Sequence, residues 1–269
     1  MVAAAGLALA LGVITALWFA GTALVAWGAN RPRATFGRSL ALAGLMGLWG
    51  MGLIALSAHD PAPRAAYIGA LGALMVWGWH ELAFLSGAVT GPNRLPCPAD
   101  LGGLARFRAA TGAVIHHELA LALTLALIVS LSWNASNPTG ACIFGLLFVL
   151  RLSSKLAIFA GVPSFSDELL PPHLAYLKSY FGPRHFSPAL IGALGFAAAL
   201  TGWLAGRALA APAGSAMGVG LCLLFGLSAL GLLEHVFLAI PLRDAALWRW
   251  AIPARTTIHG LAGEHRNGL

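Results

Sequence analysis

Seven long apolar stretches dominate the pattern of this chain, and short segments rich in turn-forming or charged residues separate them. The stretches cover residues 3–28, 39–58, 66–89, 111–133, 140–162, 188–210 and 216–241. About 20 apolar residues are enough for an α-helix to cross a bilayer. The strands of a membrane β-barrel would instead alternate apolar and polar residues, and these stretches do not. The pattern therefore predicts an all-α, polytopic membrane protein with about seven transmembrane helices.

The amino-acid composition supports this class. Of the 269 residues, 59% are hydrophobic and 9% are charged, whereas soluble domains carry roughly 25% charged residues. The first apolar stretch has no Lys or Arg before Arg31 and is longer than the core of a signal peptide, so we expect it to remain as a helix. We predict a single transmembrane domain over residues 1–250 and a tail over residues 251–269.

The basic residues predict the orientation of the helices. The first, third and fifth connections and the tail hold Arg31, Arg33, Arg38, Arg94, Arg106, Arg108, Lys178, Arg184, Arg243, Arg249, Arg255 and Arg266. The other connections hold only Arg64 and Arg207. Because cytoplasmic connections are enriched in Lys and Arg, this predicts an external N-terminus and a cytoplasmic tail. Basic loops beside anionic lipid then explain the net charge of +7 without a nucleic-acid partner.

Ionisable residues inside the predicted spans are the strongest functional signal, since such groups are costly in a bilayer and mark functional sites. They are His80, Glu81, His116, His117, Glu118, Glu234 and His235. At 1.5 Å per helical residue, all of them lie within about 15 Å of the predicted cytoplasmic ends of their helices. Arg151 and Lys155, spaced i,i+4 on one face of the fifth helix, fall at a similar depth and provide counter-charges. We therefore expect a His/Glu layer near the cytoplasmic side.

Three interpretations of this layer remain open. Imidazole and carboxylate groups suit a di-iron centre or another divalent metal. A histidine could instead be the axial ligand of a bacteriochlorophyll-type magnesium or of haem. However, known helical di-iron centres use Glu-x-x-His, whereas adjacent Glu and His side chains here diverge by about 100°. The third interpretation is a buried ion-pair or proton-handling network, in which Arg151 and Lys155 neutralise the carboxylates and the histidines orient them.

Two further patterns predict local structure. Gly44, Gly47 and Gly50 recur at a spacing of three, which allows close helix packing. The long connection around residues 163–187 places His173, Leu174, Leu177 and Phe181 at helical spacing, as in a short helix at the membrane surface. This connection could dock a partner or cover the buried layer, and its candidate residues are His173, Tyr176 and Tyr180.

The middle of the chain resembles the PuhE family, photosynthetic complex assembly proteins of purple phototrophic bacteria. The resemblance extends over about residues 1–250. It rests on Trp79-His80-Glu81, Gly91-Pro-Asn-Arg94, Cys97-Pro98, Arg106-Phe107, His117-Glu118, Arg151-Leu-Ser-Ser-Lys155, Gly161-Val-Pro163, Leu170-Pro-Pro-His-Leu174, Tyr176-Leu177 and Ser179-Tyr-Phe181. It implies a multi-span protein that supports assembly of the reaction centre and light-harvesting core and affects bacteriochlorophyll supply.

We therefore predict an assembly factor in the bacterial inner or intracytoplasmic membrane, whose His/Glu layer binds a metal or a metallo-tetrapyrrole. Its partners would be the lipid bilayer, photosynthetic complex subunits or assembly proteins, and a pigment. A membrane metalloenzyme of the di-iron oxidoreductase type, acting on a pigment or isoprenoid, is the alternative from another class. A proton-coupled transporter is a third hypothesis, which the lack of obvious inverted repeats disfavours.

Overall fold

The computed structural model describes residues 2–165, 170–212 and 214–240. Seven of its helices are long and apolar enough to cross a membrane, which confirms the predicted fold class. They are α1 (Val2–Ala29), α2 (Phe36–Ala58), α3 (Pro63–Leu85), α4 (Gly103–Leu131), α5 (Thr139–Ala160), α6 (Pro188–Ala210) and α7 (Ala216–Ala239). Two short 3-10 helices, η1 (Arg33–Thr35) and η3 (Pro172–Tyr180), lie in the connections. The predicted tail falls outside the described residues.

Two helix ends differ by four residues or more from those expected from the apolar pattern. α4 begins at Gly103 rather than at residue 111, because its first turns carry Arg106 and Arg108 and extend beyond the apolar stretch. α3 ends at Leu85 rather than at residue 89. Gly87 stops it, since its φ of 79° lies in the left-handed region and reverses the chain there.

Proline and serine residues define several helix starts. Pro63 and Pro188 occupy the first turns of α3 and α6, where a missing backbone N–H costs no helical hydrogen bond. The Ser187 hydroxyl accepts from the Leu190 N–H, and the Ser215 hydroxyl accepts from the Gly218 N–H. These caps satisfy backbone donors that would otherwise have no partner at the starts of α6 and α7.

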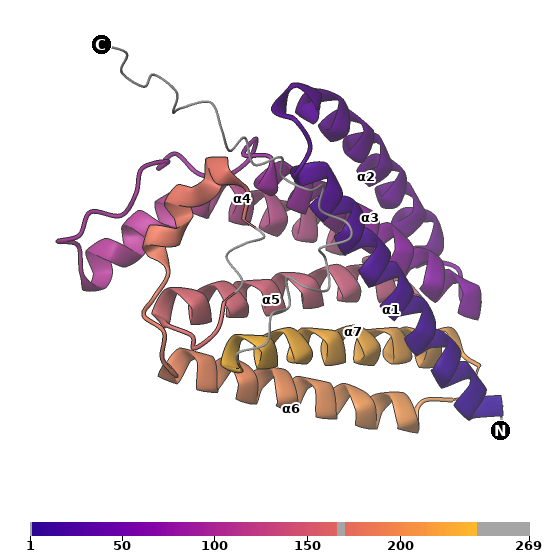
Figure 1. Cartoon of the computed structure of the whole chain (residues 1–269). Coiled ribbons are helices and arrows are strands. Elements are labelled where there is room, and N and C mark those ends of the chain that lie inside the picture. The colour runs from indigo at the N-terminus through magenta and orange to yellow at the C-terminus, as the bar shows by residue number, and fades with distance from the viewer. Residues whose placement is uncertain (1, 166–169, 213, 241–269) are drawn as a thin grey trace, which may run out of the picture.

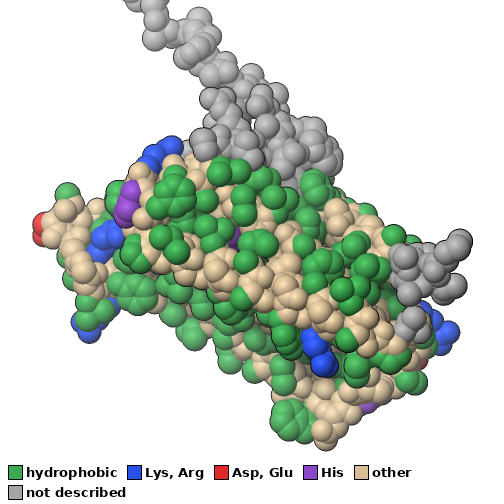
Figure 2. Space-filling view, turned by 90° about the horizontal axis from the view of Figure 1, so that it is seen from below, with side chains coloured by type: hydrophobic (Ala, Val, Ile, Leu, Met, Phe, Trp, Pro, Cys, Tyr) green, Lys and Arg blue, Asp and Glu red, His purple; other side chains and the backbone are tan. Residues whose placement is uncertain are grey.

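α3 is the central helix of the bundle and contacts α1, α2, α4, α5 and α7. Figure 1 shows α5, α6 and α7 side by side, with α1 crossing them. In the most apolar 18-residue stretch of α3, 56% of the residues are buried. The buried share of the corresponding stretch is at most 39% in each of the other six described spans. The remaining apolar surface is available to lipid. Hydrophobic side chains spread over the face in Figure 2, and most of its Lys and Arg side chains lie towards its ends.

The glycines of α2 form the close helix contact that their spacing predicted. Gly44 and Gly47 lie against the Trp79 side chain of α3. Gly50 faces Gly72 so closely that a Cβ on Gly50 would lie 2.6 Å from the Gly72 carbonyl oxygen. The two backbones therefore pack directly against each other, which fixes the position of α3 beside α2.

Replacing Gly50 by alanine should destabilise the protein by about 1–3 kcal/mol, the usual cost of overpacking a close contact. Gly52→Ala is the matched control in the same helix, because no described atom lies within 4 Å of a Cβ at Gly52. The check is the denaturant midpoint of both variants in mild detergent. Equal midpoints would show that the contact between α2 and α3 does not depend on Gly50.

Asn137 joins two helices at the end of the bundle where α2 finishes and α5 begins. Its backbone N–H donates to the Ala58 carbonyl at 2.8 Å, and its side-chain amide donates to the Ser57 carbonyl at 3.0 Å. Its Oδ1 accepts from the Thr139 hydroxyl at 2.7 Å. With 3% of its surface exposed, Asn137 binds the last turn of α2 to the first turn of α5.

The opposite end of the bundle carries the basic connections that follow α1, α3 and α5, and we call it the basic end. Arg33, Arg38, Arg94, Arg108 and Arg184 are exposed there. Which side of the membrane the basic end faces stays a prediction, with the cytoplasm expected.

Candidate functional site

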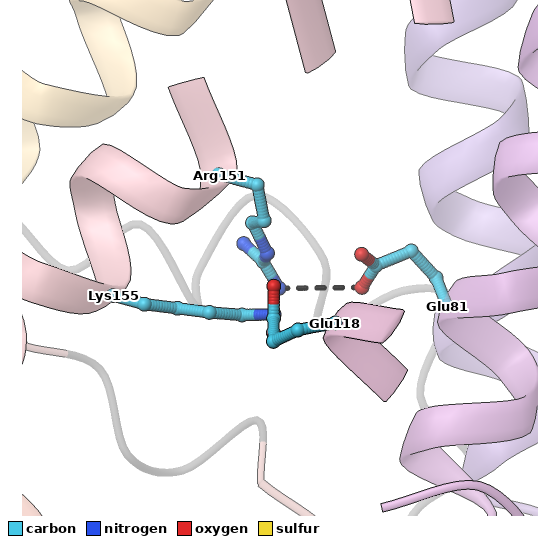
Figure 3. A network of polar contacts seen from close by, with 4 residues as sticks. All are labelled: Glu81, Glu118, Arg151 and Lys155. Carbon is cyan, nitrogen blue, oxygen red and sulfur yellow. Dashed lines mark hydrogen bonds and ion pairs between the residues drawn. The ribbon is translucent and has the colours of Figure 1, made fainter. Parts of the chain in front are cut away.

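Two ion pairs connect α3, α4 and α5 inside the bundle. The Arg151 Nη2 atom of α5 lies 3.3 Å from the Glu81 Oε2 atom of α3. One turn further along α5, the Lys155 Nζ atom lies 2.5 Å from the Glu118 Oε1 atom of α4. Figure 3 shows the two cations projecting from α5 towards the two carboxylates. The i,i+4 spacing explains why both cations leave α5 on the same face.

The two cations and two carboxylates neutralise each other. This matters most for Glu81, which is 8% exposed, since an unpaired carboxylate at that position would be costly to bury. Glu234 of α7, which is partly buried, also interacts electrostatically with Arg151. The structure thus brings five of the predicted charged residues together.

The histidines have separate environments. His80 is buried, and its Nε2 atom is hydrogen-bonded to the Thr124 hydroxyl of α4 at 2.9 Å. The His117 ring is fully buried and packs against the Phe84 ring at a tilt of 39°, with 4.7 Å between ring centroids. His116 is exposed on the surface of α4. Adjacent residues on one helix point in different directions, so only His117 of this pair belongs to the buried cluster.

His235 connects α7 to α5. Its Nδ1–H donates to the Gly231 carbonyl at 2.7 Å, so in the neutral ring Nε2 is free to accept. The Ser153 hydroxyl lies 3.2 Å from Nε2, and the Ser154 hydroxyl lies 3.4 Å from it. Both ring nitrogens of this fully buried histidine therefore have partners.

These positions do not form a metal-binding group. Among the described residues, no set of three or more His, Cys, Asp and Glu side chains is placed to hold a metal ion. Glu81 and Glu118 pair with cations instead, and the histidines are distributed around the cluster. Binding of a metal or pigment stays a prediction, while the geometry supports the ion-pair interpretation.

The predicted helix in the long connection is η3, a nine-residue 3-10 helix. Leu174, Leu177 and Tyr180 pack against Phe84 of α3 and Ala113 of α4. Because the Phe84 ring also contacts His117 and lies 5.3 Å from the Lys155 Nζ atom, η3 covers the end of the buried cluster. Whether η3 also lies at the membrane surface stays a prediction.

Hydrogen bonds to α3, to α4 and to the connection after α3 hold η3 in place. The Tyr180 hydroxyl accepts from the Asn93 amide at 2.8 Å and donates to the Leu95 carbonyl at 3.0 Å. Arg106 of α4 donates to the Tyr180 carbonyl at 2.8 Å. His173 donates from Nε2 to the Leu85 carbonyl at 2.9 Å, and the Tyr176 ring is partly buried.

Sequence reasoning missed four residues that build this site. Thr90, Asn93, Thr124 and Ser153 are neutral and polar, so they give no charge signal. Asn93 and Ser153 could have been suspected, since they lie in the family-like runs Gly91-Pro-Asn-Arg94 and Arg151-Leu-Ser-Ser-Lys155. Thr90 and Asn93 reach the site because the connection after α3 folds back on α4, where Thr90 accepts from the His117 N–H at 3.0 Å.

We expect the docking of η3 to weaken in acid. Burial lowers the pKa of His173 below its ordinary value of 6.5; the nearby charge of Arg33 also lowers this pKa, and the hydrogen bond to Leu85 opposes the shift. The docked state therefore binds fewer protons than the undocked state. The contribution of His173 to the free energy of docking is fully present above pH 6.5, and it is lost as the pH falls towards the lowered pKa. Amide hydrogen exchange over residues 172–180, corrected for intrinsic rates, measures this.

His173→Gln is the control, because glutamine keeps an N–H donor and does not titrate in this range. In this variant the corrected rate of amide hydrogen exchange over residues 172–180 should be the same above and below pH 6.5. The same acid dependence in both proteins would mean that another group is responsible.

The described residues form seven apolar helices long enough to cross a membrane, with ion pairs between α3, α4 and α5, and this defines the class: a multi-pass membrane protein. The chain belongs to the family described as "Protein of unknown function (DUF3623)", whose model matches residues 5–259. A relative from Rhodobacter capsulatus, named "Uncharacterized 30.4 kDa protein in puhA 5'region", is 40% identical over 254 residues. The alignment covers 91% of this chain and 90% of the relative. No solved structure matches the chain.

Proposed function

We propose that this protein is an assembly factor for the photosynthetic reaction centre and light-harvesting core, linked to bacteriochlorophyll supply. It would act in the inner or intracytoplasmic membrane of a phototrophic bacterium. The observation that carries the proposal is the name of the relative, which associates that protein with the puhA 5' region. The PuhE-like residues support the same role, since most of them lie in or around the buried cluster and η3.

The geometry of the site supports assembly over membrane enzymology. A di-iron oxidoreductase would need its carboxylates as metal ligands, but Glu81 and Glu118 are paired with Arg151 and Lys155. A buried network of this kind fixes the positions of α3, α4 and α5 relative to one another. The protein would then present a defined surface to its partners rather than catalyse a reaction.

The basic end is the surface we assign to docking. There η3 and the connection after α3 are held together through Tyr180 and Asn93. Arg94 and Arg108 are exposed on the same end. A rigid surface with exposed cations suits an acidic partner surface, because complementary charge guides association and selects partners.

Deletion of the gene in a phototrophic host tests the role. We expect several-fold less assembled core complex per membrane, measured by absorption spectra and native gels, with recovery on complementation. An unchanged level of core complex would contradict the proposal. Accumulation of a chemically distinct pigment precursor would contradict it as well, because that result would indicate an enzymatic step.

Complementation with surface variants tests the docking surface. Arg94→Gln combined with Arg108→Gln should give normal amounts of this protein but less core complex. Arg64→Gln is the matched control at the opposite end of the bundle, where the Arg64 side chain is largely exposed beside Asp60. Equal recovery by both variants would exclude the basic end as the docking surface.

A further inference from the structure

Buried polar atoms without partners gather around the ion pairs. Within the described residues, seven buried side-chain nitrogen and oxygen atoms have no hydrogen-bond partner in the protein. Five of them belong to four residues of this region: Glu81 Oε1, Thr90 Oγ1, Arg151 Nε and both ring nitrogens of His117. Such groups are rare in native proteins, and each one needs a physical explanation.

These four residues form one continuous polar region. Glu81 pairs with Arg151 through its other oxygen atom. Phe84, three residues further along α3, packs its ring against the His117 ring with 4.7 Å between centroids, which places His117 beside the pair. Thr90 is adjacent to His117, because its carbonyl accepts the His117 N–H at 3.0 Å. The atoms without partners therefore lie around the same part of the bundle, between α3, α4, α5 and the connection after α3.

Their chemistry identifies the kind of molecule that would satisfy them. Glu81 Oε1 accepts hydrogen bonds, Arg151 Nε donates, and the neutral imidazole and the hydroxyl can do both. The charges of Glu81 and Arg151 already balance each other, so a charged ligand is not needed. A small neutral molecule that both donates and accepts fits this set, and water is the ligand that proteins use for buried groups of this kind.

We propose that Glu81, Thr90, His117 and Arg151 enclose a buried hydration site. Ionised residues in membrane spans commonly face water-filled cavities, and water here would solvate the Glu81–Arg151 pair on the side that the protein leaves unpaired. Thr90 lies in a connection at the basic end, so the water enters from that end. This property goes beyond assembly and does not depend on it.

η3 packs over the end of this site through the cluster that contains Phe84. Its Tyr176 hydroxyl is also buried and has no hydrogen-bond partner among the described residues. The Tyr176 ring packs against the cluster that contains Phe84, and the Phe84 ring contacts the His117 ring. In this proposal water passes beside η3 on its way to the site.

Two fully buried histidines provide a matched test within one protein. His117 and His235 both have 0% of their surface exposed, but the ring nitrogens of His235 have partners in Gly231 and Ser153. Water-edited solid-state NMR of protein with 15N-labelled histidine, in lipid vesicles, measures magnetisation transfer from water to each ring. We expect transfer to His117 to be several-fold faster than transfer to His235. Equal slow transfer to both rings would overturn the proposal.

Thr90→Val tests the residues that enclose the site. Valine matches the shape of threonine without its hydroxyl, so transfer from water to His117 should slow. Thr201→Val is the control. Thr201 is a buried threonine of α6 whose hydroxyl is hydrogen-bonded to the Ala197 carbonyl and the Ser228 hydroxyl, so this variant should leave transfer to His117 unchanged. Transfer that is insensitive to Thr90→Val would show that Thr90 does not line the site, which would also overturn the assignment.

Discussion

Replacing Arg151 by glutamine should greatly reduce the amount of folded protein in the membrane. The substitution leaves Glu81, which is 8% exposed, without its cation, and breaking a buried pair in this way costs about 3–5 kcal/mol. We expect a loss near the lower figure, about 3 kcal/mol, because the Arg151 side chain itself is 41% exposed. An immunoblot of membranes and the denaturant midpoint in mild detergent measure the effect.

Arg207→Gln is the matched control for this prediction. Arg207 is also an arginine in a spanning helix, but it is exposed near the end of α6. Its replacement should change stability little. If both variants accumulate like the wild-type protein, the pair between Arg151 and Glu81 does not stabilise the fold.

Asn137→Ala should have the second largest effect, a loss of about 2–3 kcal/mol from buried groups left without partners. The substitution removes the bonds from the Asn137 side chain to the Ser57 carbonyl and the Thr139 hydroxyl. Ser57 and Thr139 are themselves buried, so water cannot readily replace the lost partner. The variant should unfold at a lower denaturant concentration, followed by tryptophan fluorescence in detergent.

The control for Asn137→Ala is Ser136→Ala in the same connection. Ser136 is exposed, so removal of its hydroxyl should leave the midpoint unchanged. A stable Asn137→Ala protein would mean that the contact between the ends of α2 and α5 contributes little to the fold.

The seven spans could be predicted because hydrocarbon demands long, continuous apolar segments. Their ends were less predictable, since charge alone suggested that Arg106 and Arg108 belong to a loop. In the structure these residues lie on the first turns of α4, and Arg106 donates to the Tyr180 carbonyl of η3. A charged side chain can thus extend a helix beyond the apolar stretch when a tertiary contact satisfies it.

The composition of the buried cluster could also be predicted, because His, Glu, Arg and Lys in spans are rare and their depths follow from helical rise. The pairing could not. It depends on the rotation of each helix, which packing against neighbouring helices sets, as the exposed His116 beside the fully buried His117 illustrates.

Residues from the connections were the least predictable part of the site. Thr90 and Asn137 both follow the pattern of ordinary turn residues in the sequence. Each becomes important only because its connection folds back against a helix. The Thr90 carbonyl then accepts from the backbone N–H of His117, and the backbone N–H of Asn137 donates to the Ala58 carbonyl. Contacts between positions so far apart in the chain leave no local signal.

A double-mutant cycle on Glu81 and Arg151 tests most directly whether the buried layer is an ion-pair network. The unfolding free energies of Glu81→Gln, Arg151→Gln and the double variant would be compared with that of the wild-type protein in detergent. The account predicts that the double variant loses less stability than the sum of the two single losses, by about 1 kcal/mol or more, as for residues in direct contact. If the loss in the double variant equals the sum of the two single losses to within about 0.5 kcal/mol, the two residues act independently. That result would contradict the network.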